Sequence, residues 1–311
     1  TLENTGVIYC AALNSGPGQS ASFTCGQDIN AASVSIGVNG KLNAASYNIT
    51  VRGNWSDDSS SGFDSGTGKV LFAGTDITVK ENSSFNDVET ESTKITLASN
   101  LTVNSTFTYK NALTIAEGSN NIFFRGAVSS KNTAENLSVS GSGSTEFNST
   151  LGNVKDLIIG GNAKFDDTVT CQSVYVIGAT QVNGGTITTN GTQQYDGKVT
   201  LGKDTLLTAK DNSNVLQAVS FGDEISGASF ALTVDGNAVF GVGSGDTVET
   251  NALYVKGTST INGGKITTLE TQTYDGDVTI GTVFAELISG TTQNPSSVIF
   301  NEDVLGLGLK V

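Results

Sequence analysis

Histidine is absent from the 311-residue sequence, and its absence excludes several kinds of active site. Ser-His-Asp and Cys-His nucleophile systems cannot form within this chain. Zinc sites with histidine ligands are excluded as well, and three scattered cysteines do not make a four-cysteine site. Methionine is absent too, and only two prolines and one tryptophan, Trp55, occur. The sequence therefore predicts no cofactor and no metal centre of these kinds.

Basic residues are scarce: 16 Lys and Arg stand against 30 Asp and Glu, a net charge of −14. Nucleic-acid binding depends on neutralising phosphates with Lys and Arg, so this balance argues against a nucleic-acid partner. It argues equally against an anionic membrane surface, and no apolar run approaches the length that inserts across a membrane. A soluble surface that resists self-association accounts for most of the acidity, and a divalent-cation role is the alternative.

Cysteine is rare. Cys10 and Cys25 lie close together in a glycine- and serine-rich segment, and their spacing favours a short disulfide loop, which fits an exported protein. The alternative is two buried thiols. Cys171 stands in an alternating run and is expected to be a small core residue. No basic and then apolar segment opens the chain at Thr1, so we expect a mature or trimmed form.

The 38 glycines, by contrast, mark an internal repeat. The stretch VYVIGATQVNGG, which starts at Val174, returns as LYVKGTSTINGG at Leu253, an interval of 79 residues (253 − 174) without a gap. Glycines and alternating apolar residues are kept in both copies, which indicates one structural unit that has been copied. The copies extend over residues 174–252 and 253–311, and the second is incomplete.

Short strands are expected throughout the chain. Triplets of an apolar residue, threonine and another apolar residue recur, as at residues 95–97 and 101–103, and place two side chains on one face and a hydroxyl on the other. No segment has a sustained helical period, so very little helix is expected. Residues 1–45 lack this rhythm and are predicted to form an N-terminal cap, followed by a repetitive body over residues 46–311.

An array of short strands with glycine turns suits a parallel β-helix better than a β-sandwich. The predicted fold class is therefore all-β, a single-stranded parallel β-helix (β-solenoid) with an atypical N-terminal cap. With roughly 20–26 residues in a coil, one repeat would hold three or four coils and the chain about 12–15. At a spacing of about 4.8 Å, these coils would form a rod on the order of 60–70 Å long.

Several runs resemble the repeats of large bacterial surface proteins. They are GFDSGTGKVLF at residues 62–72, ITLASNLTV at residues 95–103 and TYDGDVTIG at residues 273–281. The pattern is similar to that of filamentous-haemagglutinin-like adhesins and autotransporter passenger domains, and it covers about residues 47–311. The resemblance implies a right-handed parallel β-helix on a bacterial surface. The start of the chain lacks the secretion-domain motifs of two-partner haemagglutinins, which leaves the export route open.

Carboxylates are the remaining candidates for chemistry. Adjacent pairs occur at residues 57–58, 166–167, 223–224 and 302–303, and two carboxyl groups suffice to hydrolyse a glycosidic bond. Neighbouring strand residues point to opposite faces, however, and the last two pairs occupy the same place in the repeat. We therefore expect solvated turn residues, no catalytic residue and no metal ligand, with weak calcium binding as the remaining metal alternative. For Trp55, packing near the cap is favoured over a sugar-stacking role.

The favoured function is that of a non-catalytic structural or adhesive protein, a rigid extracellular rod on the bacterial surface. Its partners would be glycans or proteins of host or neighbouring cells, or further copies of itself stacked head to tail into a fibre. The candidate assembly surface is the last coil, with Val304, Leu305, Leu307, Leu309 and Val311. The chain would then be either a fragment of a longer adhesin or a complete fibre subunit. The alternative function is a polysaccharide-processing β-helix enzyme, a glycoside hydrolase or lyase.

Overall fold

The computed structural model is a β-solenoid in which parallel strands stack in about 14 turns. It describes residues 2–3, 6–10, 21–59, 62–81, 84–243, 245–281, 284–306 and 308–311, with residues 2, 3 and 7–10 described by their backbone alone. None of these residues lies in a helix, and accordingly none belongs to a helix long and apolar enough to cross a membrane. The predicted all-β solenoid and its number of coils are confirmed.

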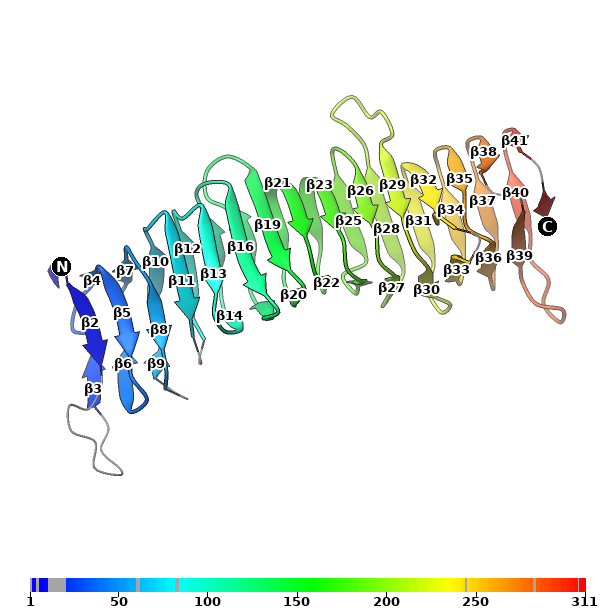
Figure 1. The fold of residues 1–311 in the computed structure, drawn as a ribbon. Coiled ribbons are helices and arrows are strands. Elements are labelled where there is room, and N and C mark those ends of the chain that lie inside the picture. Colours follow the sequence, from blue (N-terminus) through cyan, green and yellow to red (C-terminus); the bar gives the residue numbers. More distant parts are fainter. Residues whose placement is uncertain are drawn as a thin grey trace. The chain divides into compact units, whose positions relative to one another are not determined.

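Three strands make one coil, and the chain divides into two compact units, Thr1–Lys155 and Asp156–Val311. Within each unit, most strands pair in parallel with the strands one coil before and one coil after them, as the stacked arrows of Figure 1 show. Each unit therefore has three faces, which we call face 1, face 2 and face 3 in the order in which the chain visits them.

Unit 1 contains the N-terminal coils. The strands of face 1 are β1 (Leu2–Glu3), β4 (Ile29–Ala31), β7 (Ile49–Val51), β10 (Lys69–Phe72), β12 (Asp87–Thr90), β15 (Phe107–Tyr109) and β18 (Val128–Ser130). The strands of face 2 are β2 (Val7–Cys10), β5 (Ser33–Ile36), β8 (Trp55–Asp57), β11 (Asp76–Lys80), β13 (Lys94–Leu97), β16 (Leu113–Gly118) and β19 (Glu135–Gly141). The strands of face 3 are β3 (Ala21–Thr24), β6 (Gly40–Asn43), β9 (Phe63–Asp64), β14 (Leu101–Val103), β17 (Ile122–Phe124) and β20 (Ser144–Phe147). Strand β21 (Leu151–Ile159) includes the division between the units.

Unit 2 contains both copies of the repeat. The strands of face 1 are β25 (Thr186–Thr189), β28 (Thr205–Ala209), β31 (Leu232–Asp235), β34 (Leu253–Val255), β37 (Gln272–Tyr274) and β40 (Val298–Phe300). The strands of face 2 are β26 (Gln193–Tyr195), β29 (Ala218–Phe221), β32 (Asn237–Phe240), β35 (Ser259–Ile261), β38 (Val278–Ile280) and β41 (Val304–Leu305). The strands of face 3 are β22 (Asn162–Phe165), β24 (Thr180–Val182), β27 (Val199–Leu201), β30 (Ile225–Gly227), β33 (Thr247–Thr250), β36 (Lys265–Thr268), β39 (Ala285–Ser289) and β42 (Leu309–Lys310).

One long strand of unit 2, β23 (Val169–Val176), turns a corner and serves two faces. Val169 lies opposite Ile187 of β25, whereas Val174 lies opposite Gln193 of β26. The first half of β23 therefore belongs to face 1 and the second half to face 2.

Alternating side chains build the core. In β15, Phe107 and Tyr109 are completely buried and Thr108 between them is partly exposed. The same alternation of buried apolar and outward threonine side chains occurs in β14 and β27. The apolar–threonine–apolar triplets are thus strands with one buried face, as predicted from their period of two.

Aromatic rings stack in the core of unit 2 because their positions are in register. On face 2, the ring centroids of Tyr195 and Phe221 are 5.8 Å apart, and those of Phe221 and Phe240 are 5.6 Å apart. On face 1, Tyr274 and Phe300 stack at 5.5 Å. Such a pair is worth about 0.5–1.5 kcal/mol beyond the area that it buries.

Trp55 packs in the core of unit 1. Its ring is completely buried, with its centroid 4.7 Å from that of Phe63 and 5.2 Å from that of Phe85. The predicted packing role of Trp55 is therefore confirmed, and the buried ring has no surface on which a sugar could stack. In the segment predicted to be a cap, β4 and β5 pair with β7 and β8 like strands of the later coils; a cap boundary at residue 45 stays a prediction.

Candidate functional site

The predicted assembly surface lies on the last coil of unit 2. Val304 and Leu305 form β41 and are 39% and 52% exposed, and Val311 is 69% exposed. Leu309, in β42, is half-buried, and Leu307 lies outside the described residues. The structure thus places the described members of the set at least partly on the surface, and binding of another subunit there stays a prediction.

A cavity of about 320 Å³ opens in the same coil. It is lined by Glu286, Leu287, Ile288, Ser289, Ser296, Val298, Lys310 and Val311. The ammonium group of Lys310 donates a hydrogen bond to Glu286 and thereby holds the pKa of that carboxyl below its ordinary value. The volume is at the small end of the range for ligand pockets, and the lining combines one ion pair and two serines with four apolar residues.

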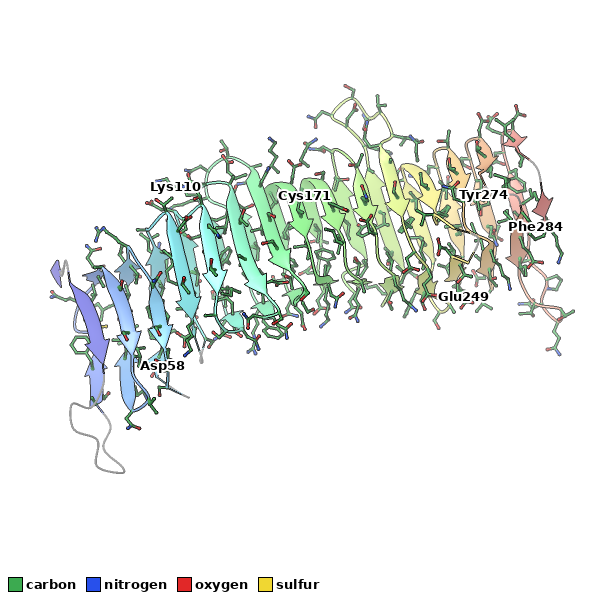
Figure 2. The ribbon with its side chains drawn as sticks, in the orientation of Figure 1. Asp58, Lys110, Cys171, Glu249, Tyr274 and Phe284 are labelled. Atoms are coloured by element: carbon green, nitrogen blue, oxygen red, sulfur yellow. The ribbon has the colours of Figure 1, made fainter. Side chains whose placement is uncertain are left out.

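The structure describes the side chain of only one of the two cysteines in the predicted disulfide, Cys25. Cys10 lies in β2, but its side chain is outside those described, so the pairing with Cys25 stays a prediction. Cys25 is buried. Cys171 is 6% exposed, as expected of a core residue, and burial raises the pKa of its thiol to about 12 (Figure 2). A thiol so far from ionisation is a poor nucleophile and metal ligand.

The first adjacent carboxylate pair is divided between the inside and the outside of the solenoid. Asp58 is exposed and forms an ion pair with Lys80, as a surface residue would (Figure 2). Asp57 is completely buried, so the prediction that it is a solvated turn residue is wrong. The reason is that β8 continues through Asp57, and alternation from the buried Trp55 turns Asp57 inward as well.

Asp57 meets a second buried carboxyl group, Glu81, which is 3% exposed. Ser56 and Lys80 are register partners, so the residues that follow them lie side by side on neighbouring coils. Burial raises the pKa of Asp57, against hydrogen bonds from the Ser59 N–H and with Glu81.

The same pair is tied to the aromatic core. The indole Nε1 of Trp55 donates a 2.6 Å hydrogen bond to Glu81 Oε2. Glu81 was not predicted to be buried, because it follows the apolar triplet of β11 as a polar residue ordinarily does at a strand end. The signal for it was its position: it continues the alternation that buries Ile77 and Val79.

In two places, a single carboxylate binds two lysine side chains that come from different coils. In unit 1, Glu89 accepts hydrogen bonds from Lys69 (2.5 Å) and from Lys131, and in unit 2, Asp235 lies 2.8 Å from Lys210 and 3.1 Å from Lys256. Burial alone would raise the pKa of each carboxyl, but the two ammonium groups outweigh it and hold the pKa below its ordinary value. These ion pairs join different coils, and their lysine side chains are partly exposed.

The repeat preserves a buried amide network. The Tyr195 hydroxyl donates to Gln193 Oε1 at 2.9 Å, and Gln193 Nε2 donates at 2.9 Å to the carbonyl oxygen of Thr208 on the next coil. In the second copy, the Tyr274 hydroxyl donates to Gln272 Oε1 at 3.1 Å, and Gln272 Nε2 donates at 2.7 Å to a carbonyl oxygen of the next coil. Both glutamines are completely buried. The copied polar residues thus serve packing.

An outward contact is copied too. The Tyr175 hydroxyl donates a 2.6 Å hydrogen bond to Asp196 Oδ2, and Tyr254 does the same to Asp275. These hydrogen bonds, first among the causes, raise the pKa of both phenols. In each copy the contact joins two successive coils.

Two hairpin loops project from unit 2, at residues 210–217 between β28 and β29 and at residues 290–297 between β39 and β40 (Figure 1). Antiparallel bridges close both loops, one from Lys210 to Leu216 and one from Gly290 to Pro295. The two loops lie at equivalent places in the two copies of the repeat, since one follows β28 and the other follows its copy β39. These loops were not predicted, although the loss of alternation over eight residues was a signal for them.

The first loop has a defined conformation. The Asp211 carboxylate accepts the N–H groups of Ser213 and Val215, both at 2.9 Å, and Asn214 has a left-handed backbone with a φ of 62°. Val215 stands 56% exposed at the surface. An ordered loop with an exposed apolar side chain is a suitable contact element.

The part of the chain that the structure describes contains no cluster of three or more Cys, Asp or Glu side chains placed to hold a metal ion. Comparisons with protein-family models, with curated proteins and with solved structures gave no match.

Proposed function

We propose that the protein is a non-catalytic structural and adhesive component of the bacterial cell surface, whose solenoid presents contact loops to host or neighbouring cells. The observation that carries this proposal is a contrast between the two copies of the repeat. The flanking strands keep Val219 and Phe221 in one copy and Val298 and Phe300 in the other. Between them, residues 210–217 (KDNSNVLQ) and the residues 79 positions later, 289–296 (SGTTQNPS), agree at no position. Variable loops on a constant scaffold are a usual place for binding residues.

The extracellular location is supported by the resemblance to surface adhesins. The partners would be glycans or proteins of the contacted cell. Head-to-tail association through the exposed Val304, Leu305 and Val311 is part of the same proposal, because a longer assembly repeats each weak contact. Electron microscopy of the purified chain tests this part: end-to-end fibres support it, and single particles at every concentration contradict it.

The alternative is a polysaccharide-processing enzyme, for which the pair of Asp57 and Glu81 would be the catalytic carboxyl groups. Both are enclosed in the core, at 0% and 3% exposure, and a glycan chain has no path to them. Their contacts favour packing over catalysis.

Adhesion of coated beads tests the proposal. Beads carrying the protein are expected to bind to cultured epithelial cells or to bacterial cells, because the loops stand clear of the solenoid. Replacing residues 211–214 and 291–294 by Gly-Ser pairs is expected to remove most of this binding with little change in urea unfolding. The control variant carries Thr188→Ser and Thr200→Ser on outward strand positions. Undiminished binding by the loop variant contradicts the role of the loops, and release of reducing ends from a glycan panel favours the enzyme.

A further inference from the structure

The 79-residue repeat of unit 2 does not contain a whole number of coils. Each strand of the first copy returns eleven strands later: β26 returns as β37, β27 as β38 and β29 as β40. Because three strands make one coil, eleven strands are three coils and two further strands. A copied strand therefore cannot return to the face from which it came.

The pairing of the strands confirms this shift for every face. Strand β26 stacks on face 2, and its copy β37 stacks on face 1. Strand β24 belongs to face 3 and its copy β35 to face 2, and β25 belongs to face 1 and its copy β36 to face 3. Each strand of the second copy thus lies one face earlier than its counterpart in the first copy: face 3 becomes face 2, face 2 becomes face 1, and face 1 becomes face 3.

The contacts of each copy move with it. The buried network of Gln193 and Tyr195 lies on face 2, and the equivalent network of Gln272 and Tyr274 lies on face 1. The loop at residues 210–217 leaves the corner between faces 1 and 2, whereas its counterpart leaves the corner between faces 3 and 1. In Figure 1 the two loops accordingly project from opposite edges of the coils, one above and one below.

Corner glycines are copied in the same way. A Cβ atom on Gly197 would lie 2.7 Å from the carbonyl oxygen of Gly178, and one on Gly276 would lie 2.8 Å from that of Gly257. The two stacked glycine pairs occupy different corners, since one follows face 2 and the other follows face 1. The same close approach of successive turns therefore fits at more than one corner.

We propose that the repeat sequence is independent of the face on which it folds. Unit 2 then accepts the loss or gain of a whole 79-residue copy, and each such change turns every outward side chain that follows it onto a neighbouring face. Copy number thereby sets the direction in which a downstream loop is presented. The inference concerns folding and presentation, and it stands whether or not the loops bind a cell.

Deletion of residues 174–252 tests the proposal, because it joins Ser173 to Leu253 and gives Tyr254 the place of Tyr175. In the full chain, Ile177 N donates a 2.9 Å hydrogen bond to Ile159 O, which sets Tyr175 opposite Ile158. The deletion variant is expected to unfold cooperatively and to form a disulfide between Ile158→Cys and Tyr254→Cys, with the native cysteines replaced. The same two substitutions in the full chain are expected to form none, since Tyr254 there lies opposite Thr233.

Two further variants complete the experiment. Deletion of residues 193–277 removes twelve strands (β26–β37), or four coils, and puts Val278 in the place of Gln193, the residue on which it stacks four coils later. Every later strand returns to its own face with its buried side unchanged, so this deletion is the matched control. Duplication of residues 174–252 retains all native coils and is expected to fold cooperatively. Failure of both the 79-residue deletion and the duplication to fold overturns the proposal, and so does a folded deletion variant in which positions 158 and 254 do not cross-link.

Discussion

Single buried polar side chains form hydrogen bonds in the core that join successive coils. Gln193 accepts a hydrogen bond from the Tyr195 hydroxyl and donates one to Thr208 O on the next coil. Replacing it by leucine therefore leaves the buried hydroxyl without this acceptor and removes the shorter of the two side-chain hydrogen bonds to that carbonyl oxygen. We predict that Gln193→Leu lowers the free energy of unfolding by about 1–3 kcal/mol in urea titrations. Gln194→Leu is the control, because the neighbouring side chain is exposed and its effect should stay within about 0.5 kcal/mol. Equal effects of the two substitutions would contradict the network.

A buried carboxyl group makes the stability of unit 1 depend on pH. Glu117 is completely buried, and burial raises its pKa above the ordinary 4.5 despite hydrogen bonds from the Gly143 N–H and the Thr145 hydroxyl. The folded state therefore holds a proton that the unfolded chain releases more readily. This contribution to stability is complete below pH 4.5 and is lost as the pH rises through the raised pKa.

Glu117→Gln is expected to remove this loss, since the amide stays neutral at every pH. Urea unfolding from pH 4 to pH 8 should accordingly give a flatter profile for the variant, which gains stability over the native chain toward the upper end. Parallel profiles for the two proteins would show that Glu117 is not the group that titrates.

Residue-level prediction from the sequence succeeded for apolar side chains and failed for polar ones. Cys171 and Trp55 were placed in the core, and both lie there. Asp57 and Gln193 were not, because polarity argues for an outward position. A polar residue points inward where the register of its strand requires it. For a single polar residue at a strand end, the sequence does not show whether the side chain points inward or outward.

Among the elements, the corners control how closely the coils stack. A Cβ atom at position 197 would meet the backbone of Gly178 at 2.7 Å, which no side-chain movement can relieve. We predict that Gly197→Ala lowers the free energy of unfolding by about 1–3 kcal/mol, the range for overpacked sites. Gly152→Ala is the matched control, because nothing lies within 4 Å of the added methyl group. Differential scanning calorimetry of the two variants checks this prediction, and equal melting temperatures would contradict it.

Strands were the elements that the sequence predicted best. The triplets at residues 101–103 and 107–109 are strands with the expected buried face. The hairpin loops were not predicted, since their closure depends on the fixed ends of the flanking strands, as in the bridge from Lys210 to Leu216 between β28 and β29. The alternation of residues within a segment is enough to identify a strand. The conformation of a loop also depends on the strands that it connects.

At the scale of the molecule, the residue spacing predicted the number of coils. It did not predict on which face each strand of a copy lies. The repeat was expected to contain three or four coils, and it contains three and two thirds. Alternation within a strand is the same on every face, so the sequence of a copy does not reveal which face it occupies. The two copies consequently present their loops at different corners of unit 2.

Disulfide trapping in the full-length chain tests this displacement most directly. With the native cysteines replaced, Tyr254→Cys is combined with Thr233→Cys in one variant and with Val239→Cys in another, and both are oxidised and analysed by mass spectrometry. The displaced repeat predicts a disulfide between positions 254 and 233, which are register partners on face 1. A disulfide between positions 254 and 239 instead would place Tyr254 on face 2, as a repeat of whole coils requires, and would contradict the account.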